Sequence, residues 1–276
     1  MSTNTLKSIL ARKRIEVAAA VVARPLEMLR ERIAEQGRPR NFFAAVVDER
    51  TDGTNTRVIA EIKRKSPSAG EIRPGATFDP VDIATQYHAA GAAAISCLTD
   101  EADFGGRLEY IHAIRDAIPL PVLRKDFLVD QYQVWEARAY GADAVLLIAD
   151  AMGEGELIDM MILARELGMT ALIEVHTLDM LLKIKHHIGF PHAGYSLLGI
   201  NNRDLNTMTT DLNHTFRVVE FVDDPHVVVS ESGIRTASDL ARLREHGVNI
   251  ALIGEHLMKQ PHPGNALRDL LAGQST

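Results

Sequence analysis

Charged residues follow directly on an apolar, strand-like run near residue 60, and their spacing could serve acid–base chemistry. The stretch 59–68 reads IAEIKRKSPS. Alternate side chains of a β-strand share a face, so Glu61 and Lys63 should point the same way. A carboxylate and an ammonium at the end of a buried strand are costly unless they pair or are used. A single pair of this kind would indicate a salt bridge, but the pattern recurs.

Polar residues of types used in catalysis recur at the ends of further apolar runs. They are Lys125 in LRKDF, Glu174 in LIEV, Asn201 and Arg203 in GINNRDL, Glu231 and Ser232 in SESGI, and Gly254 in GEHLM. Lysines and glutamates in one pocket suit general acid–base catalysis. A lysine near other cations loses basicity, and a glutamate in apolar surroundings gains it. Such a lysine could also form a Schiff base, and the sequence does not separate the two chemistries.

Short β-rich runs alternate with helical stretches in a way that would bring these residues together. The eight predicted strands are 57–62, 93–98, 121–124, 144–148, 170–175, 196–200, 226–230 and 249–253, and the predicted helices lie near 80–90, 107–117, 130–140, 154–167, 177–186, 213–222, 236–246 and 263–271. This order predicts an α/β protein with a single (β/α)8 TIM barrel, whose carboxyl strand ends form the site. A doubly wound open sheet is disfavoured because no G-x-G-x-x-G turn follows the first strand.

Residues 1–56 precede the predicted barrel of residues 57–276 and form a helical extension. Apolar residues at helical spacing begin at Leu6, Pro25 starts a second helix, and Phe42 offers an apolar anchor. The polar stretch 48–55 predicts a mobile loop. We expect the extension to pack on the barrel, either as a cap on one end or as a lid over the pocket.

Size, charge and cysteine content narrow the classes of function. The chain has 276 residues, 46% of them hydrophobic, and a net charge of −7, which argues against general nucleic-acid binding. No apolar run is long enough for a membrane span and no signal peptide is visible, so we predict a cytoplasmic protein. The one cysteine, Cys97, excludes an internal disulfide and a cysteine metal cage. The cations at 63–65 and 124–125 are predicted anion sites.

The ends of the seventh and eighth strands predict a phosphate site. Ser232-Gly233 and Gly254-Glu255 present backbone N–H groups with little steric bulk. A short helix starting near Glu255 would direct its positive end at the anion. Barrels of this kind often bind phosphate at this place. We therefore expect a small phosphorylated molecule as substrate.

Several motifs together resemble those of the indole-3-glycerol phosphate synthase family. The similar segments are AEIKRKSPSAG at 60–70, LTD at 98–100, LRKDF at 123–127, GADAVLLI at 141–148, IEV at 173–175, GINNRDL at 199–205 and SESGI at 230–234. The resemblance implies a carboxy-lyase of tryptophan biosynthesis. The reaction closes a ring, decarboxylates and dehydrates 1-(2-carboxyphenylamino)-1-deoxyribulose 5-phosphate to indole-3-glycerol phosphate. The resemblance also implies that no metal and no organic cofactor take part.

The resemblance assigns roles to individual residues. Lys125 would protonate the ketone oxygen, and Lys63 would hold the substrate carboxylate and could act as an acid in the dehydration. Glu61 and Glu174 are candidate bases for the dehydration, and both stay open. The substrate-binding residues would be Phe127 at the anthranilate ring, Asn201 and Glu231 at the sugar hydroxyls, Arg203, Ser232, Gly233 and Gly254 around the phosphate, and Ser66 in the loop after the first strand.

Two segments depart from the family's pattern. His256 stands where the family commonly has serine. It would either replace the serine hydroxyl as a donor to the phosphate or face solvent, and we favour solvent. The stretch 186–195 is longer than the family's usual connection and contains His186, His187 and His192. These histidines lack a metal-ligand spacing, so we expect a solvated loop on the barrel face away from the site.

Two other functions are weighed against the lyase. A sugar-phosphate isomerase of the same pathway would need one base and one acid, often Cys or Asp, early in the barrel, which the Lys and Glu residues disfavour. A barrel that binds a phosphorylated ligand or a protein without turnover would not need both lysines and both bases. We expect a monomer without nucleic-acid or membrane partners, and weak association with other enzymes of the tryptophan pathway stays open.

Overall fold

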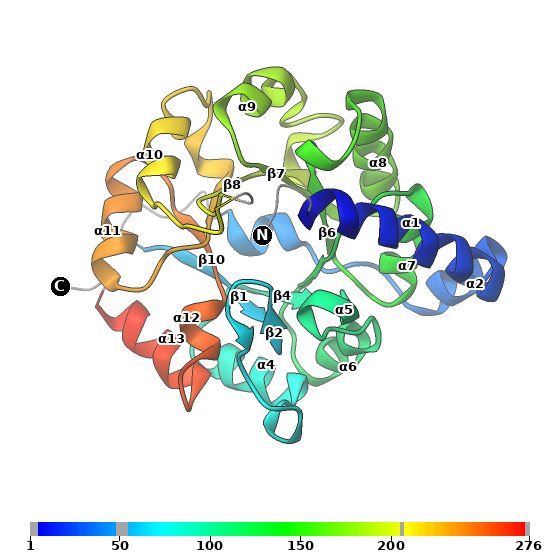
Figure 1. The fold of residues 1–276 in the computed structure, drawn as a ribbon, viewed down its shortest axis with the longest axis horizontal. Helices are drawn as coiled ribbons and strands as arrows, with labels where there is room; N and C mark the ends of the chain where they lie inside the picture. The colour runs from blue at the N-terminus through cyan, green and yellow to red at the C-terminus, as the bar shows by residue number, and fades with distance from the viewer. Residues whose placement is uncertain (1–4, 48–54, 205–206, 274–276) are drawn as a thin grey trace.

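Eight parallel strands close into a barrel at the centre of the computed structural model, which describes residues 5–47, 55–204 and 207–273. The strand order around the barrel is β1-β10-β9-β8-β7-β6-β5-β4. Their bounds are β1 (Arg57–Ile62), β4 (Ala94–Leu98), β5 (Val122–Lys125), β6 (Ala144–Ile148), β7 (Thr170–Val175), β8 (Ser196–Asn201), β9 (Val228–Glu231) and β10 (Ile250–Ile253). Figure 1 views this barrel with the helices around it. The predicted (β/α)8 barrel is confirmed.

Helices connect successive strands and cover the outside of the barrel. They are α4 (Pro80–Ala89), α6 (Glu109–Ala117), α7 (Gln131–Ala139), α8 (Glu154–Glu166), α9 (Leu178–Ile184), α10 (Asn213–Val219), α11 (Ala237–Glu245) and α13 (Pro263–Ala272). Local capping explains where several begin. Asp79 accepts a hydrogen bond from Val81 N–H at the start of α4, and Asp130 accepts one from Tyr132 N–H at the start of α7. No helix in the described ranges is long and apolar enough to cross a membrane.

Several short elements were not predicted from the sequence. The loop after β1 folds back as an antiparallel pair, β2 (Lys65–Ser66) with β3 (Gly70–Glu71). The helix α5 (Glu101–Phe104) follows β4, and the 3₁₀ turns are η1 (Gly75–Thr77), η2 (Ala149–Ala151), η3 (Lys185–His187), η4 (Ala193–Tyr195) and η5 (Pro225–Val227). Elements of two to four residues are too short to show a hydrophobic period. The short helix expected near Glu255 is present as α12 (Glu255–Met258).

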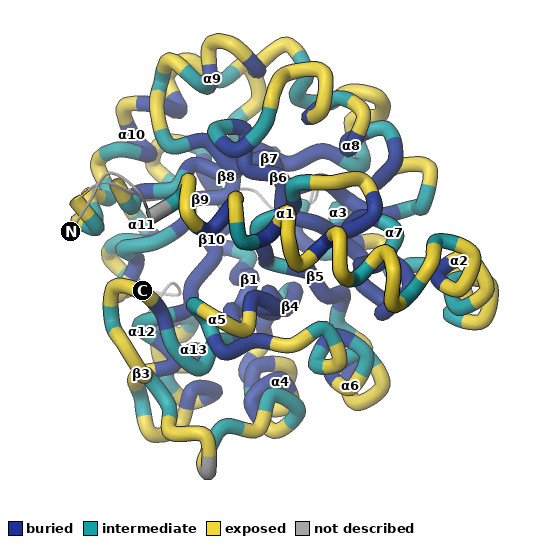
Figure 2. The backbone as a smooth tube through the Cα atoms, turned by 45° about the vertical axis from the view of Figure 1, so that its right-hand side comes forward, coloured by how far each residue is buried: buried dark blue, intermediate teal, exposed yellow. Residues whose placement is uncertain are grey.

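The strands are buried on both faces, as Figure 2 shows by the dark centre of the molecule. Side chains that point outward, such as Ile62 and Ile95, pack beneath the helices, and those that point inward, such as Ile59 and Leu123, fill the barrel. This burial explains why the strands read as continuous apolar runs rather than as alternating ones.

The N-terminal helices pack at opposite ends of the barrel. The helix α3 (Phe42–Val46) buries Phe42 among the first residues of the strands, including Ala94 and Ile250, and so closes the amino end. The helix α1 (Thr5–Ala23) lies at the carboxyl end, and α2 (Leu26–Glu35) packs on α7. A cap and a helix at the pocket are therefore both present, in different parts of the extension. Residues 48–54 of the predicted mobile loop lie outside the described residues.

Candidate active site

A cavity of about 410 Å³ opens at the carboxyl ends of the strands. The structure places the predicted catalytic and substrate-binding residues in its lining, and they come from six strands or the loops that follow them. They are Glu61, Lys63, Ser66, Lys125, Phe127, Glu174, Asn201, Arg203, Glu231, Ser232, Gly233 and Gly254. In this fold the carboxyl end of the barrel is where catalytic residues gather.

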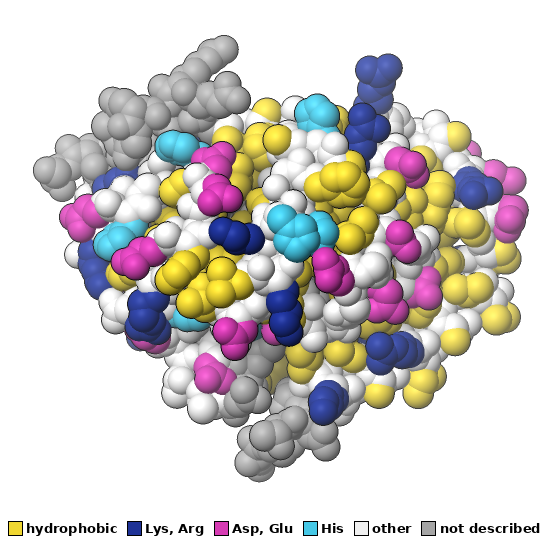
Figure 3. Space-filling view, turned by 90° about the horizontal axis from the view of Figure 1, so that it is seen from above, with side chains coloured by type: hydrophobic (Ala, Val, Ile, Leu, Met, Phe, Trp, Pro, Cys, Tyr) yellow, Lys and Arg dark blue, Asp and Glu magenta, His cyan; other side chains and the backbone are white. Residues whose placement is uncertain are grey.

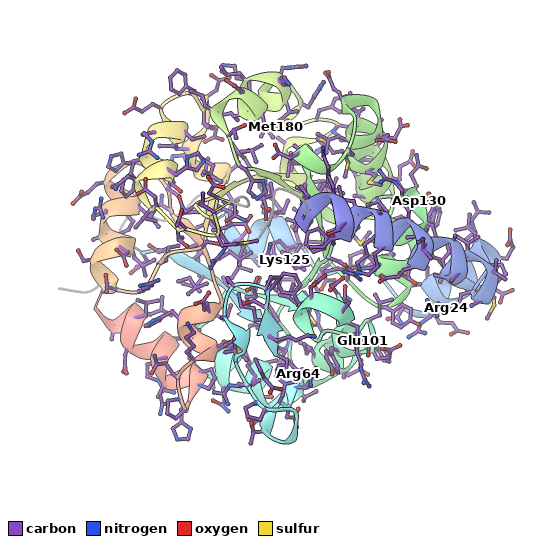
Figure 4. All side chains as sticks on the ribbon, in the orientation of Figure 1. Arg24, Arg64, Glu101, Lys125, Asp130 and Met180 are labelled. Carbon is purple, nitrogen blue, oxygen red and sulfur yellow. The ribbon has the colours of Figure 1, made fainter. Side chains whose placement is uncertain are left out.

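Lys125 lies near the centre of the barrel in Figure 4 and contacts two carboxylates. Its Nζ atom is 3.1 Å from Oε2 of Glu174 and 3.3 Å from Oε2 of Glu231. Burial lowers the pKa of Lys125, but the carboxylates of Glu174, Glu231 and Glu61 outweigh burial and raise it. The expectation that neighbouring cations reduce its basicity is wrong, because the groups around its ammonium are acidic.

The two carboxylates beside Lys125 have pKa values shifted in opposite directions. Burial raises the pKa of Glu174, but Lys125 and His176 outweigh burial and lower it. Burial raises the pKa of Glu231, and the charge of Glu174 raises it further, against the effect of Lys125. One carboxylate is thus held ionised, while the other takes up a proton more readily. Unequal proton affinities in one pocket allow acid and base roles to be divided between like residues.

His176, which the sequence analysis did not single out, lies behind Glu174. Its Nδ1 atom is 3.1 Å from Oδ2 of Asp150, and its Nε2 atom is 3.1 Å from Oε1 of Glu174. The second contact is an ion pair without hydrogen-bond geometry. Burial lowers the pKa of His176, but the two carboxylates outweigh burial and raise it to about 10. A charged imidazolium therefore lies against Glu174 at neutral pH.

Glu61 and Lys63 share one face of the chain, as the strand alternation predicts. Lys63 Nζ donates a hydrogen bond of 2.6 Å to Oε1 of Glu61. Gly254 of the neighbouring strand end leaves room for this carboxylate, since a Cβ at that position would lie 2.2 Å from Oε1 of Glu61. Gly254 therefore has a steric role in addition to the one predicted at the phosphate.

Three of the predicted anion-binding cations do not line the cavity, and that prediction is wrong for them. Lys65 donates to the carbonyl of Ala102, and Arg64 faces Glu71 at 4.0 Å. Arg124 is buried on the outer side of β5, where its guanidinium pairs with Asp126 at 3.2 Å and Glu136 at 3.0 Å. A guanidinium committed to two carboxylates is not free for an anionic ligand.

The predicted phosphate end of the cavity combines strained backbone with a paired arginine. Ser232 and Gly233 have φ values of 68° and 85°, and a positive φ is uncommon for serine. Arg203 donates to the Met208 carbonyl at 3.2 Å and to Oε2 of Glu255 at 3.0 Å. His256 also lines the cavity, whereas the sequence favoured a side chain facing solvent.

An apolar wall faces the charged groups. The rings of Phe104, on α5, and Phe127 lie 6.1 Å apart at an interplanar angle of 43°. Leu6 and Ile9 of α1 complete this wall. Phe104 was not predicted, because a phenylalanine in the polar stretch after the second strand carries no motif of its own. The two rings contact each other and offer one apolar surface, on which a planar apolar group can pack.

Buried ion pairs fasten α1 to the carboxyl ends of β4 and β5. Lys13 Nζ lies 2.8 Å from Oδ2 of Asp100 and 2.8 Å from Oδ1 of Asp126. Arg12 pairs with Asp100 at 2.9 Å and with Asp103 at 2.6 Å. These contacts hold Leu6 and Ile9 against the cavity, so the N-terminal helix forms part of the site.

Fold and site together define a (β/α)8 barrel of the kind that carries acid–base residues at the carboxyl ends of its strands. Residues 6–270 match the family model described as indole-3-glycerol phosphate synthase. The chain belongs to the indole-3-glycerol phosphate synthase family.

Curated relatives agree with this family over nearly their whole length. The chain is 46% identical over 273 residues to indole-3-glycerol phosphate synthase of Azoarcus sp. strain BH72, covering 97% of this chain and 99% of that one. It is 45% identical over 274 residues to the protein of the same name from Laribacter hongkongensis, covering 98% and 100%. A solved 3-hexulose-6-phosphate synthase is similar in fold alone, with 15% identity, a TM-score of 0.60, and coverage of 79% and 99%.

Proposed function

We propose that the protein is an indole-3-glycerol phosphate synthase. It converts 1-(2-carboxyphenylamino)-1-deoxyribulose 5-phosphate to indole-3-glycerol phosphate, carbon dioxide and water. The observation that carries this proposal is the position of Lys125 between Glu174 and Glu231 in a cavity that Lys63, Phe104 and Phe127 also line. The family membership of the chain supports the same reaction.

The two lysines divide the first half of the reaction. Lys125 stays protonated because carboxylates surround it, and it donates its proton to the ketone oxygen as the aromatic carbon attacks. Lys63 holds the substrate carboxylate until carbon dioxide leaves. Phe127, supported by Phe104, packs on the anthranilate ring and fixes its distance from the ketone carbon.

The carboxylates serve the dehydration. Glu174 accepts the proton that leaves the ring, since its lowered pKa keeps it ionised at neutral pH and it lies beside Lys125. Glu61 is the alternative base, and its contact with Lys63 places it at the same cavity. Glu231 and Asn201 orient the sugar hydroxyls. Lys63 supplies the one proton that the hydroxyl needs to leave as water.

The phosphate end of the substrate lies at Arg203, Ser232, Gly233 and Gly254. Glu255 must then share Arg203 with the phosphate or release it, since the two are paired at 3.0 Å. Ser66, whose Oγ accepts from Ala69 N–H, lines the loop over the substrate. Three properties stay predictions from the sequence: the protein is monomeric, it is cytoplasmic, and its reaction uses neither a metal nor an organic cofactor.

The test is a spectroscopic assay of indole formation from the anthranilate-derived ribulose phosphate, with Lys125→Ala beside the wild type. Turnover by the wild type that falls at least a thousandfold in the variant is expected. Lys65→Ala is the matched control, because this neighbouring lysine lies outside the cavity lining. No turnover by a folded wild type that still binds the substrate would favour the binding-only barrel.

A further inference from the structure

Three side chains capable of binding a metal converge on the outside of the barrel. Glu154 is the first residue of α8, and His186 and His187 lie in the turn η3 that follows α9. The Nε2 atom of His187 is 2.7 Å from Oε1 of Glu154, and that of His186 is 3.5 Å from the same oxygen. None of the three lines the active-site cavity. Figure 3 shows histidine and carboxylate side chains side by side on the face of the molecule above α9.

The separations of the three atoms fit a small divalent ion. Their ligand atoms all lie within 4.8 Å of one another. Tetrahedral zinc with bonds of about 2.0–2.1 Å places its ligand atoms about 3.4 Å apart. The two contacts of Glu154 differ from that spacing by less than 1 Å, a difference that rotation of surface side chains removes.

The arrangement is more than an ordinary ion pair. Both imidazoles direct Nε2 at one carboxylate oxygen, and the two rings lie 3.8 Å apart between centroids. A metal ion takes the lone pair of an imidazole nitrogen, and both Nε2 atoms point to one place where a single cation can take them. His187 is only 15% exposed, so the turn already holds one ligand in place.

We propose that Glu154, His186 and His187 form a binding site for a divalent transition metal of the zinc type. Two imidazole nitrogens and one carboxylate oxygen are ligands that zinc prefers, and the exposed fourth position is open to water. The bound ion would tie the long connection at 186–195 to the start of α8. The sequence analysis predicted a solvated loop without a metal because the histidines alone lack a ligand spacing. The proposal revises that prediction, because Glu154, which lies 32 residues before His186 in the chain, supplies a further ligand.

The test is calorimetric titration of zinc chloride into the full-length, metal-free protein without a histidine tag. One equivalent should bind, and His186→Ala and His187→Ala should each weaken binding at least tenfold. His112→Ala is the matched control, because His112 faces Asp116 at 3.4 Å and no third candidate ligand joins them among the described residues. Cobalt(II) in place of zinc should give the visible absorption of a four-coordinate site, and magnesium should not bind.

The proposal would be overturned if the wild type did not bind zinc. It would also be overturned if the variant that carries both His186→Ala and His187→Ala bound zinc as tightly as the wild type. Circular dichroism establishes that each variant is folded. Glu154→Gln removes the anionic ligand while keeping the side chain's shape, so it replaces any histidine variant that does not fold. Indole formation should be unaffected by all three substitutions. A protein that binds zinc but lacks turnover would therefore contradict the proposed function and leave this site intact.

Discussion

Gly199 on β8 lies directly beneath the carboxylate of Glu231 on β9. A Cβ atom at Gly199 would be 2.3 Å from Oε1 of Glu231, closer than any real contact. A carboxylate is the far end of a flexible side chain, so it would move before the strands do. The absence of a side chain at Gly199 therefore sets where Glu231 lies relative to Lys125, which is 3.3 Å away.

The substitution Gly199→Ala should impair turnover more than folding. Displacement of Glu231 from Lys125 should lower kcat at least tenfold, while the melting temperature falls by only a few degrees. Indole formation and thermal unfolding measure the two effects. Gly155→Ala is the control, because a Cβ on this helical glycine meets nothing within 4 Å. Full turnover by Gly199→Ala would show that Glu231 does not need its position.

The substitution His176→Gln should shift the acid side of the pH–rate profile to higher pH. The imidazolium favours ionised Glu174, and its removal raises the proton affinity of that carboxylate. The groups that face His176 are Asp150, Glu174 and His214, and the pKa of His214 is lowered by burial and then by Arg217. The measurement is kcat/KM between pH 5 and 9. An unshifted profile would exclude an influence of His176 on the base.

The stabilisation that charged His176 gives the folded protein should be lost in alkali. Its pKa in the folded protein, about 10, is above the unfolded value of about 6.5. The stabilisation is therefore complete below pH 6.5 and is lost as the pH rises toward 10. Urea unfolding at pH 6, 8 and 10 should show a decline in the free energy of unfolding that His176→Gln lacks. The exposed His226→Gln should keep the decline.

Asp126 should contribute to stability until the solution is strongly acidic. Burial alone would raise the pKa of Asp126, but Arg124 and Lys13 outweigh burial and lower it to about 2. The contribution is present above the unfolded pKa of about 3.9 and is lost as the pH falls through 2. Unfolding free energies at pH 5, 4, 3 and 2 should fall more steeply for the wild type than for Asp126→Asn. Equal slopes would contradict this pKa.

The substitution Lys13→Met should destabilise the protein strongly. It leaves Asp100 and Asp126 buried without their shared ammonium, and breaking a buried pair in this way costs about 3–5 kcal/mol. Urea unfolding at pH 7 measures the loss. Arg14→Ala, on the exposed side of the same helix, should change the free energy of unfolding by less than about 0.5 kcal/mol. If Lys13→Met lowered the free energy of unfolding by as little as Arg14→Ala, water would be replacing the ion pairs of Lys13.

The sequence was sufficient to predict the barrel, because buried parallel strands must be apolar throughout and because residues typical of helix ends mark the helices between them. It was also sufficient for residues such as Lys125, since alternation at a strand end decides which side chains point inward. It could not show the electrostatic surroundings of Lys125, because Glu174 and Glu231 come from other strands. For the same reason it missed His176, whose partner Asp150 is 26 residues away. Phe104 escaped notice in a short helix without periodicity.

The neighbours Arg124 and Lys125 have consequences for how the barrel assembles. One cation is neutralised between β5 and α7, and the other among the carboxylates of the cavity. A slip of β5 by one residue would exchange the two faces of the strand. The guanidinium would then point into the cavity, away from Glu136, and the ammonium would lie beneath the helices, away from Glu174 and Glu231. Each cation would thus lose the carboxylates that it pairs with in the native alignment, so Lys125, which serves the reaction, also helps to fix the alignment of the strand.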